Sequence, residues 1–135
     1  MKNLNVVAAI IIHNGQILCM QRGQAKQDYI SYKYEFPGGK IELGETRTEA
    51  LMRELKEEMN IEVKIAEEDY FMTVNHSYPD FELTMHSYIC RVDTKEFVRK
   101  EHIDHQWMTP QELKTLEWAL ADYPIVERLR ERDIC

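Results

Sequence analysis

The first part of the chain alternates between apolar runs and turn-forming residues in a way that predicts β-strands. The runs LNVVAAIIIH (residues 4–13) and QILCMQR (16–22) are rich in Ile, Val and Leu. Asn14 and Gly15 lie between them, and this pair adopts positive φ at little cost, so we expect a hairpin turn at His13-Asn14-Gly15. Residues 23–32 show no clear periodicity and predict a polar loop.

The second half of the chain contains longer strand candidates. Residues 61–78 and 81–93 are rich in β-branched and aromatic residues and predict a strand pair that turns at Pro79 and Asp80. Residues 105–110 predict one more short strand. Strands on both sides of an internal helix are typical of a mixed sheet with helices packed on it, an α+β organisation.

The internal helix has clear signals at both ends. Thr46 and Glu49 have the spacing of a capping box, which predicts that the helix begins there. Asn60 is a residue that tolerates the left-handed conformation, so we expect the helix to end near residue 59. Four apolar residues share one arc at helical spacing and are predicted to face the core: Leu51, Met52, Leu55 and Met59. Residues 110–116 and 124–132 predict two shorter helices.

Size and composition are those of an ordinary globular domain. The 135 residues predict one domain, residues 1–135, with 44% hydrophobic and 30% charged residues. The formal net charge of −7 argues against a nucleic-acid polymer as partner. No apolar run reaches the roughly 20 residues needed to cross a bilayer, and we expect neither a signal sequence nor a membrane partner. Cys19, Cys90 and Cys135 lack metal-like spacing and are interpreted as reduced thiols of a cytoplasmic protein.

Acidic residues concentrate on the internal helix beside its buried arc. Glu54, Glu57 and Glu58 lie at spacings i, i+3 and i+4, where like charges cost roughly 0.2–0.5 kcal/mol a pair. A divalent cation would reverse the sign of that interaction, and hard carboxylate oxygens suit Mg²⁺, with Mn²⁺ as a second candidate. The alternative is a solvated face on which Arg53 and Lys56 are the partners.

A turn-forming triplet precedes this helix. Pro37, Gly38 and Gly39 have poor helix and strand propensity, so we interpret them as a turn that lets the backbone approach another group closely.

Together these features resemble the signature of the Nudix hydrolases. Residues at the family's spacings are Gly39, Glu45, Arg53, Glu54, Leu55, Glu57, Glu58 and Ile61. Asn60 departs from the pattern, which has Gly there, but Asn also accepts a left-handed helix stop. The stretch EFPGGKIE, the YPD turn, Trp107-Met108 and the start of the last helix resemble the MutT-type nucleotide branch more loosely. The resemblance implies the Nudix fold, a mixed β-sheet sandwiched between α-helices.

The resemblance also implies a metal site. Its ligands would be the Gly38 carbonyl and the carboxylates of Glu54, Glu57, Glu58 and Glu101. Arg53 would orient these glutamates and Glu45 would support it, with Glu54 as the general base. Alternatives stay open: Glu45 as a favourable charge near the helix start, and Glu101 as a surface acid. His102 and His105 are interpreted as loop histidines, and His76 and His86 as structural.

The activity implied is Mg²⁺-dependent hydrolysis of a nucleoside triphosphate to a monophosphate and pyrophosphate. Asp122, at the start of the last helix, would recognise the nucleobase of 8-oxo-dGTP or of a CTP-like nucleotide; its alternative role is a helix N-cap. Four further residues would bind substrate: Arg22 and Lys40 at phosphates, Phe36 and Tyr78 stacked on the base or buried in the core. We expect a monomer or weak dimer with a small-molecule partner.

Two other classes of function remain open at this stage. One is a Nudix hydrolase of ADP-ribose or dinucleoside polyphosphates, for which this chain shows no additional motif outside the signature. The other is a nucleotide sensor without catalytic activity, but every glutamate of the signature is present.

Overall fold

The computed structural model describes residues 2–132. Its strands and α-helices follow in the order β1 (Lys2–His13), β2 (Gln16–Gln21), β3 (Tyr34–Glu35), β4 (Gly38–Lys40), α1 (Arg47–Met59), β5 (Tyr70–Ser77), β6 (Phe81–Arg91), β7 (Asp104–Met108) and α2 (Tyr123–Glu131). Short 3-10 helices cover Glu67–Asp69, Pro110–Thr115 and Leu120–Asp122. No helix in this described part is long and apolar enough to span a membrane.

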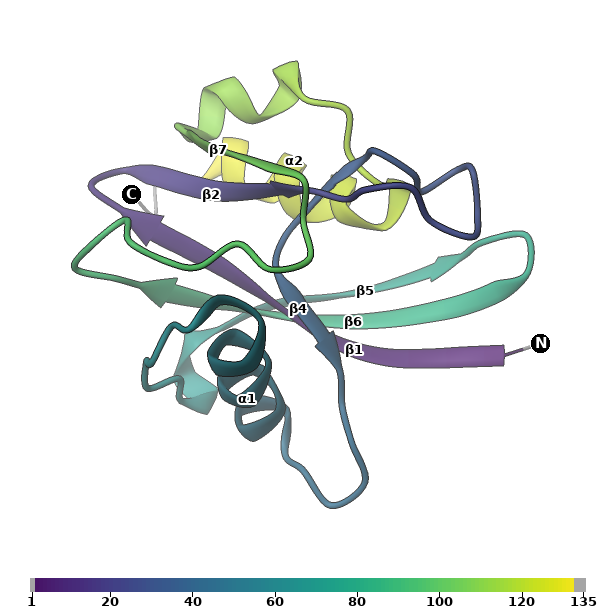
Figure 1. Ribbon diagram of the computed structural model, residues 1–135, viewed down its shortest axis with the longest axis horizontal. Coiled ribbons are helices and arrows are strands. Elements are labelled where there is room, and N and C mark those ends of the chain that lie inside the picture. Colours follow the sequence, from purple (N-terminus) through teal and green to yellow (C-terminus); the bar gives the residue numbers. More distant parts are fainter. Residues whose placement is uncertain (1, 133–135) are drawn as a thin grey trace.

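The strands form one mixed seven-stranded sheet (Figure 1). Its main path runs β3-β2-β1-β6-β5, while β4 pairs with β1 and β7 pairs with β2. β1 and β6 are parallel from the pair Lys2 and Phe81 to the pair Ile12 and Arg91. The other pairings are antiparallel. β1 therefore has neighbours along both of its edges and is the central strand.

β1 is also buried on both faces, because its alternate side chains pack into different cores. Odd-numbered residues, Val7, Ala9 and Ile11, join the cluster that contains Leu51, Leu55 and Met59 of α1. Even-numbered residues, Ala8, Ile10 and Ile12, join the cluster that contains Ile125, Val126 and Leu129 of α2. A nearly continuous apolar run is what such a strand requires. Figure 1 shows α1 and α2 on opposite sides of the sheet, which confirms the predicted sandwich.

The predicted internal helix and its caps are confirmed. Thr46 is the N-cap: its Oγ1 accepts the Glu49 N–H at 3.2 Å, and the Thr46 N–H donates to Glu49 Oε1 at 2.9 Å. The helix ends at Asn60, which adopts the left-handed conformation with φ of 54°. Asn60 therefore serves as the helix stop in place of glycine.

Both predicted hairpin turns are confirmed. Asn14 and Gly15 have positive φ values of 49° and 78° between β1 and β2. The turn between β5 and β6 is closed by the Tyr78 N–H, which donates to the Phe81 carbonyl at 2.8 Å. Residues 22–33 form a loop, as expected. Cys19 and Cys90 are free, buried thiols; Cys135 lies outside the described residues.

The prediction of one strand over residues 61–78 is wrong in its first half, because β5 begins only at Tyr70. The Ile61 N–H donates to the Leu55 carbonyl at 3.1 Å and so completes the end of α1. A 3-10 turn follows, in which Asp69 Oδ2 accepts the Ala66 N–H at 2.9 Å. The apolar residues at 61, 63 and 65 instead pack against the core of α1. The short helix predicted over residues 110–116 is present as a 3-10 helix, Pro110–Thr115.

The glycines before α1 are strand residues, which corrects the prediction of a turn. Gly38 and Gly39 form β4 and pair with Ala8 and Val7 of β1. A Cβ added to Gly38 would lie 1.9 Å from the Val7 carbonyl oxygen. The close approach inferred for this triplet is real, and its first partner is the backbone of the central strand.

Gly38→Ala should therefore destabilise the protein by about 2 kcal/mol or more, since neither backbone can move without disturbing β1. Gly23→Ala is the matched control, because its Cβ would meet only the Ile103 side chain, at 3.1 Å. Urea unfolding of both variants measures the difference. Equal losses in the two variants would contradict the packing argument.

Candidate active site

Two adjoining cavities lie beside β4. The Asp122 cavity, about 570 Å³, is lined by Phe36, Lys40, Tyr78 and Asp122 among others. The acidic cavity, about 260 Å³, is lined by Glu54, Glu58, Glu101 and His102 among others. Arg22, Glu35 and Gly38 line both cavities. The two cavities therefore share a wall and lie next to each other.

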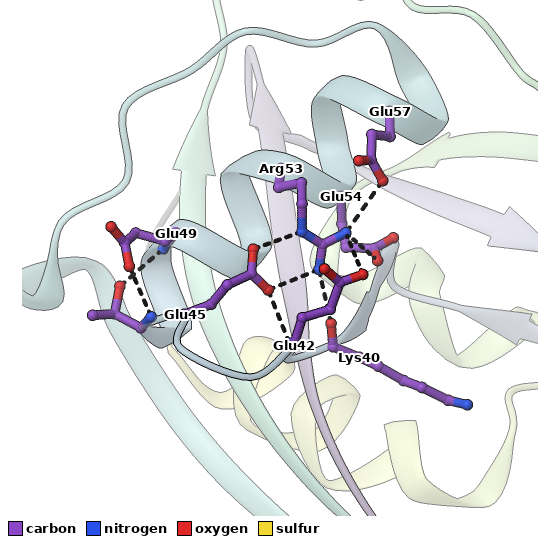
Figure 2. Close-up of polar contacts among 8 residues, drawn as sticks. Lys40, Glu42, Glu45, Glu49, Arg53, Glu54 and Glu57 are labelled. Atoms are coloured by element: carbon purple, nitrogen blue, oxygen red, sulfur yellow. Dashed lines mark hydrogen bonds and ion pairs between the residues drawn. The ribbon is translucent and has the colours of Figure 1, made fainter.

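Arg53 of α1 contacts three acids of the signature, Glu45, Glu54 and Glu57 (Figure 2). Its guanidinium donates to both oxygens of Glu45, Nε at 2.6 Å and Nη2 at 2.9 Å. Nη1 donates to Glu54 at 3.0 Å and to Glu57 at 3.2 Å. Nη2 also donates to the Lys40 carbonyl at 3.0 Å, which ties α1 to the end of β4. The planar fork of arginine is the side chain that can hold several carboxylates at once.

The acids of the site fall into two electrostatic groups. The Arg53 fork and the Glu42 N–H hold the pKa of Glu45 below its ordinary value. Burial raises the pKa of Glu54, and the charges of Glu57 and Glu101 add to this rise while Arg53 opposes it. Burial and the neighbouring Glu101 raise the pKa of Glu58. Negative charge thus remains only partly compensated around the acidic cavity.

This donor set fits a hard divalent cation. A Cβ on Gly39 would lie 2.4 Å from Glu54 Cδ, so only glycine leaves room for that carboxylate beside β4. Gly38, Glu54, Glu58 and Glu101 all line the acidic cavity, and oxygen ligands suit Mg²⁺ or Mn²⁺. Within residues 2–132, no group of three or more His, Cys, Asp or Glu side chains is already arranged to hold a metal ion. Arg53 instead engages Glu54 of this set, together with Glu45 and Glu57.

Glu57 and Glu45 do not line the acidic cavity. Glu57 is the more exposed of the two, with 57% of its side chain accessible, and it reaches the site through Arg53. Glu45 contacts Arg53 alone among the predicted catalytic side chains. Glu45 directly precedes the N-cap Thr46, so it binds the guanidinium and also lies near the start of α1.

Asp122 is buried at 4% exposure and occupies the N-cap position of α2, but its side chain makes no capping hydrogen bond there. Its Oδ1 accepts the Phe36 N–H at 3.2 Å. Burial raises its pKa well above the ordinary value, and the charge of Glu35 adds to this rise. The carboxyl is thus attached to the segment that leads into β4.

The two aromatic candidates belong to the core and also line the Asp122 cavity. Phe36 stacks on Trp118 with ring centroids 4.7 Å apart. Tyr78 accepts the Ala121 N–H at 3.0 Å and stacks on Tyr29 at 5.1 Å. Their rings are held by the core, so they can form a rigid wall for a planar ligand.

The predicted basic and histidine residues differ in which of the two cavities they line. Arg22 lines both cavities and pairs with Glu35 at 3.4 Å, whereas Lys40 lines only the Asp122 cavity. His102 contacts Glu35 at 2.8 Å, an interaction that sequence reasoning missed. The sequence feature that could have indicated Glu35 as a site residue is its place in the EFPGGKIE stretch, directly before Phe36.

The remaining histidines lie away from the cavities. His86 is buried and contacts Asn5 and Thr73, which fits the structural role predicted for it. His105 lies in β7 rather than in a loop, which corrects its predicted placement.

Comparison with known proteins agrees with this geometry. The NUDIX domain family matches residues 2–129, so the chain belongs to that family. The chain is 35% identical over 130 residues to the CTP pyrophosphohydrolase of Escherichia coli K12, covering 94% of this chain and 91% of that protein. It is 31% identical over 131 residues to the 8-oxo-dGTP diphosphatase of the same organism, covering 96% and 98%. The solution structure of the E. coli ORF135 protein superposes with a TM-score of 0.81 at 32% identity, covering 97% and 91%.

Asp122→Asn should stabilise the protein increasingly as pH rises. Burial raises the native pKa of Asp122 above that of the unfolded chain, so the native state keeps a proton that the unfolded state has lost. Stability contributed by the protonated carboxyl is therefore lost from about pH 4 upward. Asparagine cannot ionise and keeps an oxygen for the Phe36 N–H. The Tm of Asp122→Asn minus the Tm of wild type should increase by about 2–6 °C between mildly acidic and mildly alkaline buffer.

Asp80→Asn provides a control of opposite sign. Hydrogen bonds from Tyr29 and Gln27 lower the pKa of Asp80, so its stabilisation is present above the unfolded pKa and lost as pH falls. This variant should lose Tm at neutral pH and approach wild type in acid. Parallel pH trends in the two variants would refute the assignment of Asp122 as a carboxyl disfavoured by burial.

Proposed function

We propose that this Nudix domain, residues 1–135, is a divalent-metal-dependent nucleoside triphosphate pyrophosphohydrolase that releases a nucleoside monophosphate and pyrophosphate. The observation that carries the proposal is the pair of adjoining cavities, one acidic and one containing Asp122 between aromatic walls. The names of the two E. coli relatives, a CTP pyrophosphohydrolase and an 8-oxo-dGTP diphosphatase, support the same substrate class. The buried free thiols of Cys19 and Cys90 support a reducing, cytoplasmic location.

The residues proposed to hold the metal are the Gly38 carbonyl and the carboxylates of Glu54, Glu57, Glu58 and Glu101. Mg²⁺ is the proposed ion, with Mn²⁺ as substitute, because the donors are hard oxygens. When bound, such an ion neutralises phosphate charge and lowers the pKa of a coordinated water. An acidic protein with a net charge of −7 needs this compensation to bind a polyphosphate.

Arg53 and Glu45 are proposed to position these acids rather than touch the substrate. Arg53 holds Glu54 at 3.0 Å and Glu57 at 3.2 Å, and both contacts restrict side chains that repel each other. Glu45 holds the guanidinium in turn. Glu54, which lines the acidic cavity, is the proposed general base for the attacking water.

The nucleobase is proposed to enter the Asp122 cavity. One carboxyl oxygen of Asp122 accepts the Phe36 N–H, and the second is the atom we assign to the edge of the base, where it accepts an N–H when the carboxyl is ionised and donates an O–H when it keeps its proton. Phe36 and Tyr78 provide apolar walls, and Arg22 and Lys40 lie where phosphates can be met. Candidate substrates are 8-oxo-dGTP and CTP-like nucleotides, both of which present an amino group or ring N–H to an acceptor.

A nucleotide screen tests the proposal. The purified chain is incubated with 8-oxo-dGTP, dGTP, CTP, ADP-ribose and a dinucleoside polyphosphate, with Mg²⁺ or with EDTA. Pyrophosphate, phosphate and the nucleotide products are measured separately, because ADP-ribose and dinucleoside polyphosphates are cleaved to mononucleotides without release of pyrophosphate. We expect pyrophosphate from one or more of the triphosphates and none in EDTA. Release of phosphate alone, turnover in EDTA, or hydrolysis only of ADP-ribose or dinucleoside polyphosphates would contradict the proposal.

Glu57→Gln should lower turnover by about 100-fold or more, because a ligand and a partner of Arg53 is lost. Glu101→Gln should cause a smaller loss, which higher Mg²⁺ partly restores. Both variants should melt like wild type, because both positions are exposed and amide oxygens can still accept hydrogen bonds. Glu127→Gln on α2 is the control, since Glu127 pairs only with Arg130 among the contacts described for it. Normal turnover of Glu57→Gln would remove Glu57 from the site.

A further inference from the structure

The segment that precedes Glu101 is attached to the end of α1. The Val98 N–H donates to the Met59 carbonyl at 2.9 Å, and Lys100 Nζ donates to the Glu57 carbonyl at 2.8 Å. Both acceptors lie in the last turn of α1, where carbonyls have no partner within the helix. A lysine at this end also interacts favourably with the helix dipole. The chain before Glu101 thus caps the helix that carries the signature glutamates.

The segment that follows Glu101 is attached to the sheet. His102 Nε2 donates to Glu35 Oε2 at 2.8 Å, and only 16% of the His102 side chain and 23% of the Glu35 side chain are accessible. The Ile103 N–H donates to the Gln21 carbonyl at 3.0 Å. Glu35 belongs to β3 and Gln21 to β2. Glu101 is therefore held between an attachment to α1 and an attachment to the strands.

Glu101 needs such attachments because electrostatic repulsion from neighbouring carboxylates disfavours its position. It is exposed to solvent and lies beside the carboxyl groups of Glu54 and Glu58 at the acidic cavity, close enough to Glu58 to share a hydrogen bond with it. Repulsion between these groups in their ionised forms favours movement of Glu101 outward into water. A side chain kept beside like charges must be restrained through its backbone or its neighbours.

We propose that His102 is a positioning residue that holds Glu101 at the acidic cavity through its hydrogen bond to Glu35. This inference rests on the proposed function, since it concerns a ligand of the proposed metal site. Glu35 also lines the Asp122 cavity and directly precedes Phe36, whose N–H binds Asp122. The His102 contact thus joins the metal-binding segment to the wall shared with the nucleobase cavity.

Mn²⁺ binding without nucleotide provides the test, with free Mn²⁺ measured by electron paramagnetic resonance. Wild type is compared with His102→Ala, His102→Gln and His105→Ala. Removing a direct outer partner of a ligand typically costs 10–100-fold in metal affinity; His102 acts on Glu101 through the backbone, so the Mn²⁺ Kd of His102→Ala should rise about tenfold, the lower end of that range. His102→Gln should largely restore affinity, because its amide nitrogen can donate to Glu35. His105→Ala is the matched control: His105 contacts Arg99 and Phe97 rather than Glu35.

Thermal melts and turnover complete the experiment. The metal concentration for half-maximal turnover should shift in His102→Ala by the same factor as the Mn²⁺ Kd, while kcat at saturating metal changes little. Unchanged Mn²⁺ affinity in His102→Ala, or an equal loss in His105→Ala, would overturn the inference. Failure of Gln to restore affinity would overturn it as well. If wild type itself binds no Mn²⁺, the result contradicts the metal site of the proposed function, and with it the inference about His102.

Discussion

The burial of β1 on both faces is the constraint on which the rest of the structure depends. Its odd-numbered side chains pack against α1 and its even-numbered side chains against α2. Its edges are occupied by β6 along one side and by β4 and β2 along the other. The acidic helix and the helix that follows Asp122 are therefore placed by one strand, on opposite faces of the sheet.

The contact between β4 and β1 places the backbone of β4 at the walls of the two cavities. Gly38 lies against the Val7 carbonyl and Gly39 against the Glu54 carboxylate, at distances that no side chain would permit. The backbone before α1 is thereby drawn into the space between the two cavities. One short strand forms a wall of the acidic cavity on one side and of the Asp122 cavity on the other.

The negative charges of the site are only partly compensated by positive charge. Arg53 provides one guanidinium for Glu45, Glu54 and Glu57, while Glu58 and Glu101 face each other without it. The stability of this arrangement comes from packing and from the attachments of residues 98–103, not from the acids themselves. A site that stores uncompensated negative charge is suited to bind a cation together with an anionic ligand.

The sequence by itself determined the elements whose causes are local. The capping box at Thr46, the left-handed stop at Asn60 and the Asn14-Gly15 turn each depend on a few neighbouring residues, and all three are confirmed. The spacing of the acids also identified the acidic helix, because a fixed spacing on a helix fixes which side chains share a face. The family came from the resemblance of the residues to the Nudix signature.

Only the tertiary structure decided the features that depend on partners distant along the chain. The sequence predicted a strand over the apolar residues between 61 and 65, but in the structure these residues pack against α1. The sequence left Asp122 open between a nucleobase contact and a helix N-cap, and only the structure shows that its carboxyl is buried and accepts the Phe36 N–H, 86 positions away. The contact between Glu35 and His102 joins residues 67 positions apart. Neither periodicity nor propensity carries information about such pairs, because both report only a residue's immediate neighbours along the chain.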